Sequence, residues 1–229
     1  QKTAGQEEGP ELPCPRSDEP GAPGQAVTDD PRGRGEIKSS QLPGVKFVEA
    51  GFAQYPLKGG GYIVIHNPGG GVQSHERLVD FFRKPTNNNG KLGVHFSILM
   101  NGDVRQHTSL DKAVNHAPPL NYVSYGIEVM NPSSRGMPSK KFKPGPPKQY
   151  EELWKLVKKI SRNSPNFSLS FPNLKRSDAT FFMGSTRRLK GVIPHSSFNG
   201  NRSDGRFSVL YMAMRYIGKP PAEAYKISV

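Results

Sequence analysis

The sequence has 229 residues, of which 34% are apolar, and a net charge of +13 at pH 7. This length suits one domain with an additional segment. No apolar run approaches the roughly 20 residues of a membrane-spanning helix, and no signal peptide is recognisable at the start. The single cysteine, Cys14, excludes an intrachain disulfide, so cysteine content does not indicate a cellular compartment.

Residues 1–42 are rich in Pro, Gly, Glu and Asp and have almost no periodic apolar pattern. Such a segment buries too little apolar surface to offset the entropy lost on ordering. We therefore predict a disordered leader or linker at 1–42 and one folded domain at 43–229. The leader has eight acidic and five basic residues, so the domain carries about +16. That charge attracts polyanions, either nucleic acid or anionic cell-wall polymer, unless it only aids solubility.

The first strong structural signals surround two short apolar segments. Residues 61–67 are apolar, β-branched and bounded by glycines, which predicts a buried central strand ending at His66. Residues 75–83 have apolar side chains at helical spacing. Ser74 is placed to cap that helix and Pro85 to end it.

Further along, the sequence predicts a hairpin from residues 92–100 and 103–107, because Asn101-Gly102 is a strong two-residue turn signal. Residues 122–130 are expected to form another strand.

Residues 132–148 are rich in Pro, Gly and Lys, which is typical of a surface loop. Helical spacing recurs at 150–160 and 207–217, on either side of a short strand at 189–194 that leads to His195. Strands and helices mixed in this way predict an α/β domain built around one central mixed sheet.

Two histidines and one carboxylate indicate the chemistry. His66 and His195 each follow a predicted strand, and Asp204 comes nine residues after His195. Zinc takes nitrogen and oxygen ligands, and a catalytic site uses three of them and leaves one position for water. The pattern therefore predicts a hydrolytic zinc site.

The order of further motifs is similar to that of the N-acetylmuramoyl-L-alanine amidase and peptidoglycan-recognition protein family. Between the two histidines lie Val94-His95-Phe96-Ser97-Ile98 with the turn Asn101-Gly102-Asp103, then Asn115-His116-Ala117, then Tyr125-Gly126-Ile127-Glu128. Each motif is weak alone, whereas their order over residues 60–218 is specific.

The resemblance implies that His66, His195 and Asp204 bind Zn²⁺, since the third ligand in this family is Cys or Asp. This sequence departs from the family at Asn199-Gly200, where relatives have Ala-Pro, so the path of the loop between His195 and Asp204 is left open. A surface Asp-Gly turn is the alternative interpretation of Asp204.

The resemblance also assigns catalytic roles. One branch of the family has a Tyr before the hairpin histidine, and the other has a Glu on the later strand; Val94 and Glu128 match the Glu branch, which includes anhydro-muropeptide amidases. Glu128 is then the general base and acid. Arg202 stands where relatives often have a Lys that stabilises the oxyanion, or it is a solvated loop cation.

The remaining histidines receive weaker assignments. The resemblance implies that His116 faces the substrate. His95 lies inside an apolar strand, where a core histidine or a partner of a metal ligand is expected. His75 and His107 receive no role.

These observations lead to the expectation of a zinc amidase that cleaves between N-acetylmuramic acid and L-alanine in peptidoglycan, facing the cell wall as a secreted, periplasmic or phage-associated lysin. Muropeptides are the expected partners, with no specific nucleic acid and no membrane span. The alternatives are a non-catalytic peptidoglycan-binding protein and a basic nucleic-acid-binding domain. The sequence leaves the oligomeric state and the stem-peptide preference open.

Overall fold

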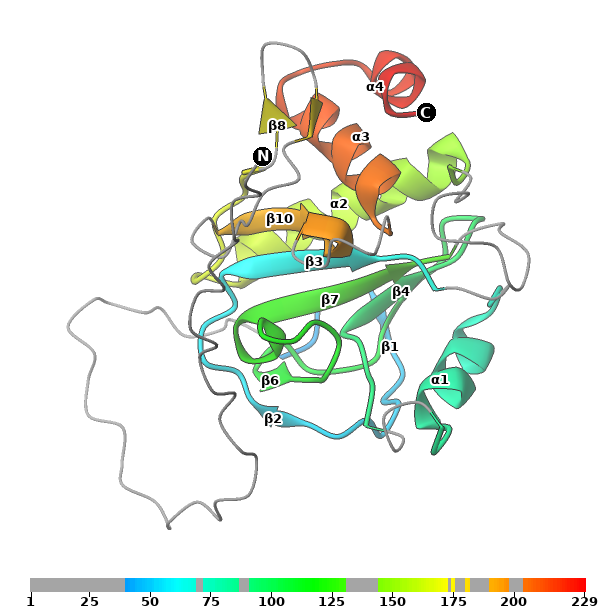
Figure 1. The fold of residues 1–229 in the computed structure, drawn as a ribbon, viewed down its shortest axis with the longest axis vertical. Coiled ribbons are helices and arrows are strands. Elements are labelled where there is room, and N and C mark those ends of the chain that lie inside the picture. Colours follow the sequence, from blue (N-terminus) through cyan, green and yellow to red (C-terminus); the bar gives the residue numbers. More distant parts are fainter. Residues whose placement is uncertain are drawn as a thin grey trace, which may run out of the picture. The chain divides into compact units, whose positions relative to one another are not determined.

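The structure, a computed structural model, describes residues 40–68, 72–86, 91–130, 144–172, 174–175, 180–181, 190–197 and 204–229. Its centre is a six-stranded sheet with the strand order β1-β5-β4-β7-β3-β10 (Figure 1). In that order the strands are β1 (Lys46–Phe47), β5 (Val104–Gln106), β4 (Phe96–Ile98), β7 (Ser124–Val129), β3 (Tyr62–His66) and β10 (Gly191–Pro194). β4 and β5 pair antiparallel and the other neighbours pair parallel, which confirms the predicted α/β class with a mixed sheet.

The smaller elements lie around this sheet. Two short antiparallel pairs are β2 (Tyr55–Pro56) with β6 (Lys112–Ala113), and β8 (Leu174–Lys175) with β9 (Thr180–Phe181). The α-helices of the described residues are α1 (His75–Arg83), α2 (Pro147–Asn163), α3 (Arg206–Tyr216) and α4 (Pro221–Ser228). Figure 1 shows α2, α3 and α4 gathered together, with α1 apart from them.

Local sequence signals account for β3 and α1. All five residues of β3 are buried, as expected for a central strand that is covered on both faces. α1 begins after Ser74, whose hydroxyl accepts a hydrogen bond from the Arg77 N–H at 3.2 Å. The predicted strand and the predicted helix, with its cap, are both confirmed.

Two apolar clusters hold the helices on the sheet. The larger joins β3, β7 and β10 to α2 and α3 through side chains such as Ile65, Ile127 and Leu153. The smaller packs Leu78 and Phe82 of α1 against Val94, Phe52 and their neighbours. Burying each such side chain stabilises the fold by about 1.5–3 kcal/mol.

The last residues of the predicted leader contact the folded domain. Leu42 is only 2% exposed and belongs to the larger cluster, and its N–H donates to Gln106 Oε1 at 2.8 Å. The Leu110 N–H likewise donates to the Ser40 carbonyl at 2.9 Å. Residues 40–42 therefore pack on the domain, so the folded part of the chain includes at least these three residues of the predicted leader. The rest of the predicted leader lies outside the described residues.

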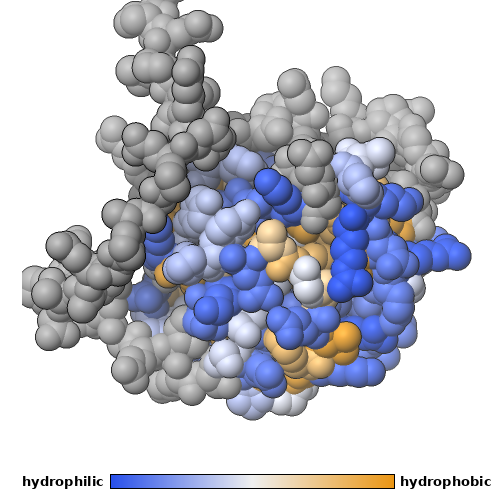
Figure 2. All heavy atoms as spheres, turned by 90° about the horizontal axis from the view of Figure 1, so that it is seen from below, coloured by the Kyte–Doolittle hydropathy of each residue, from blue (hydrophilic) through white to orange (hydrophobic). Residues whose placement is uncertain are grey.

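No helix of the described residues is both long and apolar enough to cross a membrane. On the face shown in Figure 2, hydrophilic residues surround small hydrophobic patches.

Candidate metal centre

Parallel strands bring the two predicted histidine ligands to one edge of the sheet. His66 ends β3, and His195 follows β10 directly. The strands pair in parallel with Ile65 opposite Pro194, so both histidines leave the sheet at its carboxyl end. Crevices outside the carboxyl ends of strands are the usual ligand sites of α/β sheets.

The third predicted ligand, Asp204, is positioned by the residue that follows it. Gly205 has φ +83°, and a Cβ atom there would lie 2.3 Å from the Ile65 carbonyl oxygen, so only glycine allows this approach. The Gly205 N–H donates to Asn67 Oδ1 at 2.7 Å, and Asn67 Nδ2 donates to the Val129 carbonyl at 2.7 Å. Asn67 thus ties the segment that bears Asp204 to the ends of β3 and β7.

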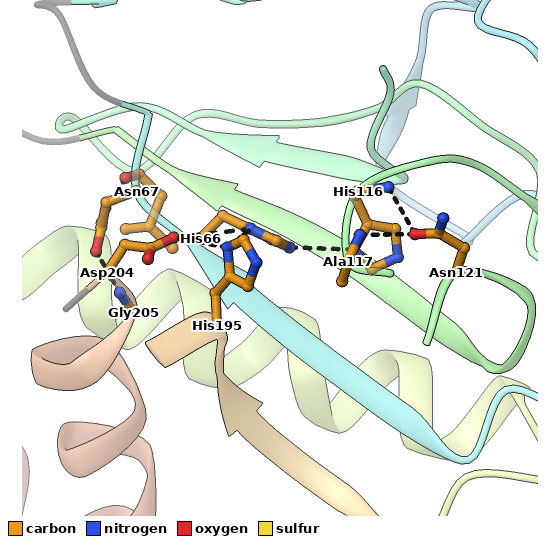
Figure 3. Close-up of polar contacts among 9 residues, drawn as sticks. His66, Asn67, His116, Ala117, Asn121, His195, Asp204 and Gly205 are labelled. Atoms are coloured by element: carbon orange, nitrogen blue, oxygen red, sulfur yellow. Dashed lines mark hydrogen bonds and ion pairs between the residues drawn. The ribbon is translucent and has the colours of Figure 1, made fainter. Parts of the chain in front are cut away.

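The three side chains converge on one point (Figure 3). His66 Nδ1 lies 3.1 Å from His195 Nδ1 and 3.8 Å from Asp204 Oδ2, and His195 Nδ1 lies 3.1 Å from the same carboxylate oxygen. All three residues are buried. Asp204 Oδ1 is also buried and has no hydrogen-bond partner among the described residues. The three form a possible metal site.

A chain of hydrogen bonds fixes the proton on His66. The Ser124 hydroxyl donates to the Leu120 carbonyl at 2.6 Å, so it accepts from His116 Nε2 at 3.1 Å. His116 Nδ1 then accepts from His66 Nε2 at 3.0 Å. This arrangement leaves the unprotonated Nδ1 of His66 facing His195 and Asp204, the tautomer that a metal ligand needs. Burial lowers the pKa of His116 well below its ordinary value, which keeps its ring neutral.

His116 is itself firmly held. Its backbone N–H and that of Ala117 both donate to Asn121 Oδ1, at 2.9 and 2.6 Å. A Cβ atom on Gly126 would lie 2.7 Å from His116 Cγ, so this glycine makes room for the ring. His116 also lines the cavity at the metal site, and the substrate contact expected for it stays a prediction.

Glu128 shares that cavity with the three candidate ligands. It lies opposite His66 in the β3–β7 register, so both side chains leave the sheet on the same face, and it is 6% exposed. The site cavity has a volume of about 330 Å³ and is lined by His66, Asn67, Pro68, Phe81, Phe82, Leu92, Gly93, Asn115, His116, Glu128, His195 and Asp204. Arg202, the predicted oxyanion residue, lies outside the described residues.

The other histidines are structural. His95 accepts a hydrogen bond from the Gly126 N–H at 3.1 Å and donates from Nε2 to the Lys112 carbonyl at 2.7 Å, which makes it a core histidine. The Ser97 hydroxyl lies between His75 Nδ1 and His107 Nε2, at 2.6 and 2.7 Å. No sequence pattern predicts this buried group or the contacts made by Asn67, Asn121 and Ser124.

An α/β sheet that presents two histidines and an aspartate at its carboxyl edge has the layout of a metal-dependent hydrolase. The family model described as N-acetylmuramoyl-L-alanine amidase matches residues 60–204, more than half of the chain. The chain therefore belongs to this amidase family, which confirms the resemblance seen in the sequence.

Two solved structures have the same fold. The chain is 15% identical to N-acetylmuramoyl-L-alanine amidase LysC from Clostridium intestinale URNW, with a TM-score of 0.51, and the match covers 76% of this chain and 98% of that one. It is 14% identical to a selenomethionine derivative of AmpD, also with a TM-score of 0.51, over 85% of this chain and 99% of that one. At these identities the likeness shows the fold alone. No curated protein matches the sequence.

Proposed function

We propose that this chain is a zinc-dependent amidase that hydrolyses the bond between N-acetylmuramic acid and L-alanine in peptidoglycan. The observation that carries the proposal is the convergence of His66, His195 and Asp204 in a chain that belongs to the amidase family.

The donor spacing supports zinc as the metal. Zinc binds His nitrogen and carboxylate oxygen at about 2.0–2.2 Å, and tetrahedral geometry places such ligands roughly 3.3–3.6 Å apart. The separations between the three donor atoms are 3.1, 3.1 and 3.8 Å, which lie just below and just above this range. A cation would also compensate the buried Asp204 carboxylate, whose Oδ1 has no hydrogen bond within the described part of the chain. His66, His195 and Asp204 would hold the ion, and two histidines with one carboxylate leave its fourth position open.

Bound zinc would supply a water of pKa about 7 and would polarise the substrate carbonyl. Glu128 would take the proton from the attacking water and deliver it to the departing amide nitrogen, since it opens into the same cavity. Phe81, Phe82 and Leu92 would provide an apolar wall against the substrate. Arg202 would stabilise the oxyanion, and His116 would both orient His66 and contact the substrate.

The decisive test measures zinc and hydrolysis together. Elemental analysis of the purified chain should give close to one zinc per chain, and a soluble muropeptide should release its peptide with a new L-alanine amino terminus. His195→Ala and Asp204→Asn should lose both zinc and hydrolysis, whereas the control Asp111→Asn, an exposed aspartate away from the cavity, should keep both. Full zinc content in His195→Ala would refute the ligand assignment.

The same assay separates an amidase from a non-catalytic peptidoglycan-binding protein. A chain that bound muropeptide without cleaving it, with or without a chelator, would be a peptidoglycan-binding protein. A cell-wall-facing or phage-associated location agrees with the proposed substrate and forms part of the same proposal.

A further inference from the structure

A second and larger cavity lies away from the metal site. It has a volume of about 540 Å³ and shares no lining residue with the site cavity. One wall is the outer side of α2, and the other is β1 with the turn between β4 and β5. We call it the basic groove; it is lined by Gly44, Val45, Lys46, Gly102, Asp103, Val104, Glu152, Lys155, Leu156, Lys158, Lys159 and Arg162.

Cations outnumber carboxylates in this groove, with five Lys or Arg residues against Asp103 and Glu152. Both carboxylates have cationic or histidine partners: Glu152 binds Lys155 at 2.7 Å, and Asp103 Oδ2 lies 3.2 Å from His75 Nε2. Lys46 and Arg162 have no ion pair with any described residue. The groove therefore presents an excess of positive charge to solvent.

The cations are arranged in a row on a rigid support. Lys155, Lys159 and Arg162 follow one another at helical spacings of four and three residues, so they share one face of α2 over about 10 Å. Lys159 Nζ donates to the Pro43 carbonyl at 2.9 Å and so joins α2 to the opposite wall. The inner side of α2 is fixed by buried Leu153, Val157 and Ile160. A linear polyanion matches such a row better than a small ion does.

The lining also limits which polyanion fits. Proteins that bind single-stranded nucleic acid combine a positive groove with aromatic side chains on which the bases stack. None of the described residues that line the basic groove is aromatic, and the nearby Trp154 is buried beneath the Lys158 ammonium, which lies 5.1 Å from its ring centroid. The described lining therefore offers cationic contacts for phosphates and no aromatic surface on which bases could stack.

We propose that the basic groove binds a polyol phosphate chain, a phosphodiester polymer without bases, independently of the metal site. Such binding would hold the protein on an anionic envelope polymer and leave the site cavity open to its own substrate.

The test uses the full chain and fluorescently labelled poly(glycerol phosphate) in a titration by anisotropy. The triple variant Lys46→Gln/Lys155→Gln/Arg162→Gln removes one cation from β1 and two from α2, and it leaves the Lys159–Pro43 bond in place. The control Lys84→Gln/Lys190→Gln/Lys226→Gln removes the same charge from exposed positions outside the groove. Circular dichroism and the thermal midpoint should show that both variants are folded.

We expect the groove variant to bind poly(glycerol phosphate) at least tenfold more weakly than the unmodified chain, and the control to stay within threefold. The negative slope of log affinity against log salt should become shallower by about two in the groove variant, as expected when three phosphate contacts are lost. Hydrolysis of a soluble muropeptide should be the same in both variants, because neither touches the site cavity.

Three outcomes would overturn the proposal. The unmodified chain could fail to bind the polymer, or the control could weaken as much as the groove variant, which would indicate general charge attraction. Oligo(dT) or duplex DNA could bind more tightly than poly(glycerol phosphate) with the same sensitivity to the groove variant, which would identify a nucleic-acid site.

Discussion

Asn67 Oδ1 accepts a hydrogen bond from the Gly205 N–H at 2.7 Å, which joins the residue after the first candidate ligand to the residue after the third. Because this bond sets the position of Asp204, its loss should loosen the metal site. We expect Asn67→Ala to lower zinc affinity about 10–100-fold in chelator competition. The free energy of unfolding should fall by about 1–3 kcal/mol, since two buried backbone groups lose their partner.

Gln54→Ala is the matched control, because the Gln54 amide bonds only to an exposed Glu49 in the described structure. An Asn67→Ala protein with zinc affinity equal to that of the control would show that Asp204 is held by other contacts.

The Glu128 assignment gives the second prediction. Glu128→Gln should keep the fold and the zinc, because Glu128 lies beside the three candidate ligands and is not one of them. Hydrolysis should fall about 10²–10⁴-fold, the usual contribution of a general acid–base residue. The measurement is the rate of muropeptide cleavage at equal zinc content. A rate within threefold of the unmodified chain would assign the proton transfers to another residue.

Gly126 provides a steric test of the contact between His116 and His66. Gly126→Ala would place a Cβ atom 2.7 Å from His116 Cγ, so the ring must move away from His66. We expect a loss of about 1–3 kcal/mol in unfolding free energy, typical of overpacking, together with weaker zinc binding. In the control Gly61→Ala the nearest atoms to the new Cβ belong to the flexible side chain of Lys190, so this variant should be nearly neutral. Unchanged zinc affinity in Gly126→Ala would argue against the positioning role of His116.

The buried histidines predict how stability depends on pH. Burial lowers the pKa of His95 and of His107 to about 4, whereas a histidine in the unfolded chain has a pKa of about 6.5. Between these values the unfolded state binds protons that the folded state does not. Stability should therefore fall as the pH drops from about 6.5 to 4, by up to about 3 kcal/mol for each histidine, and neither contributes above that window.

Urea denaturation at pH 7.5, 5.5 and 4.5, with chelator in every sample, measures this loss. His95→Gln should reduce it, since a glutamine does not titrate and can still donate and accept a hydrogen bond. If the variant lost as much stability as the unmodified chain between pH 7.5 and 4.5, His95 would not be a source of the effect.

The burial of Leu42 predicts how far the chain can be shortened from its N-terminal side without loss of stability. Removing residues 1–39 should leave the unfolding free energy within about 1 kcal/mol of the full chain, because that segment lacks the apolar pattern needed to bury a core. Removing residues 1–42 also deletes a side chain that is 2% exposed and its hydrogen bond to Gln106, at a cost of about 2–4 kcal/mol. Urea denaturation of the two truncated chains should resolve this difference, and equal stabilities would place the packed boundary elsewhere.

Elements with strong local signals could be predicted from the sequence. β3 and α1 have such signals, an apolar β-branched run in one case and an N-cap with helical spacing in the other. The two-residue strands β1, β2 and β6 have none, because each is defined by a partner far along the chain. α4 is not among the elements predicted above, although Pro221 in its first turn and Glu223 two residues later are helix-start signals.

The candidate site likewise has residues that could be predicted from the sequence and contacts that could not. The order of His66, His195 and Asp204 could be recognised along the chain, and the structure brings the three together. The hydrogen bonds from His66 to His116 and from Gly205 to Asn67 join residues that are 50 and 138 positions apart. A periodic pattern in the sequence does not predict such contacts. The positions of the supporting side chains therefore required the folded structure.

The parallel pairing of β10 with β3 also has a consequence during translation. His195 is 129 residues from His66, and the strand that delivers it is made after every other strand of the six-stranded sheet. A ribosome-bound chain that ends before Gly191 has His66 and Glu128 but neither of the other two candidate ligands. The candidate metal site can therefore be assembled only after Asp204 has been made, and until Gly191–Pro194 has been made the β10 side of β3 has no strand to pair with.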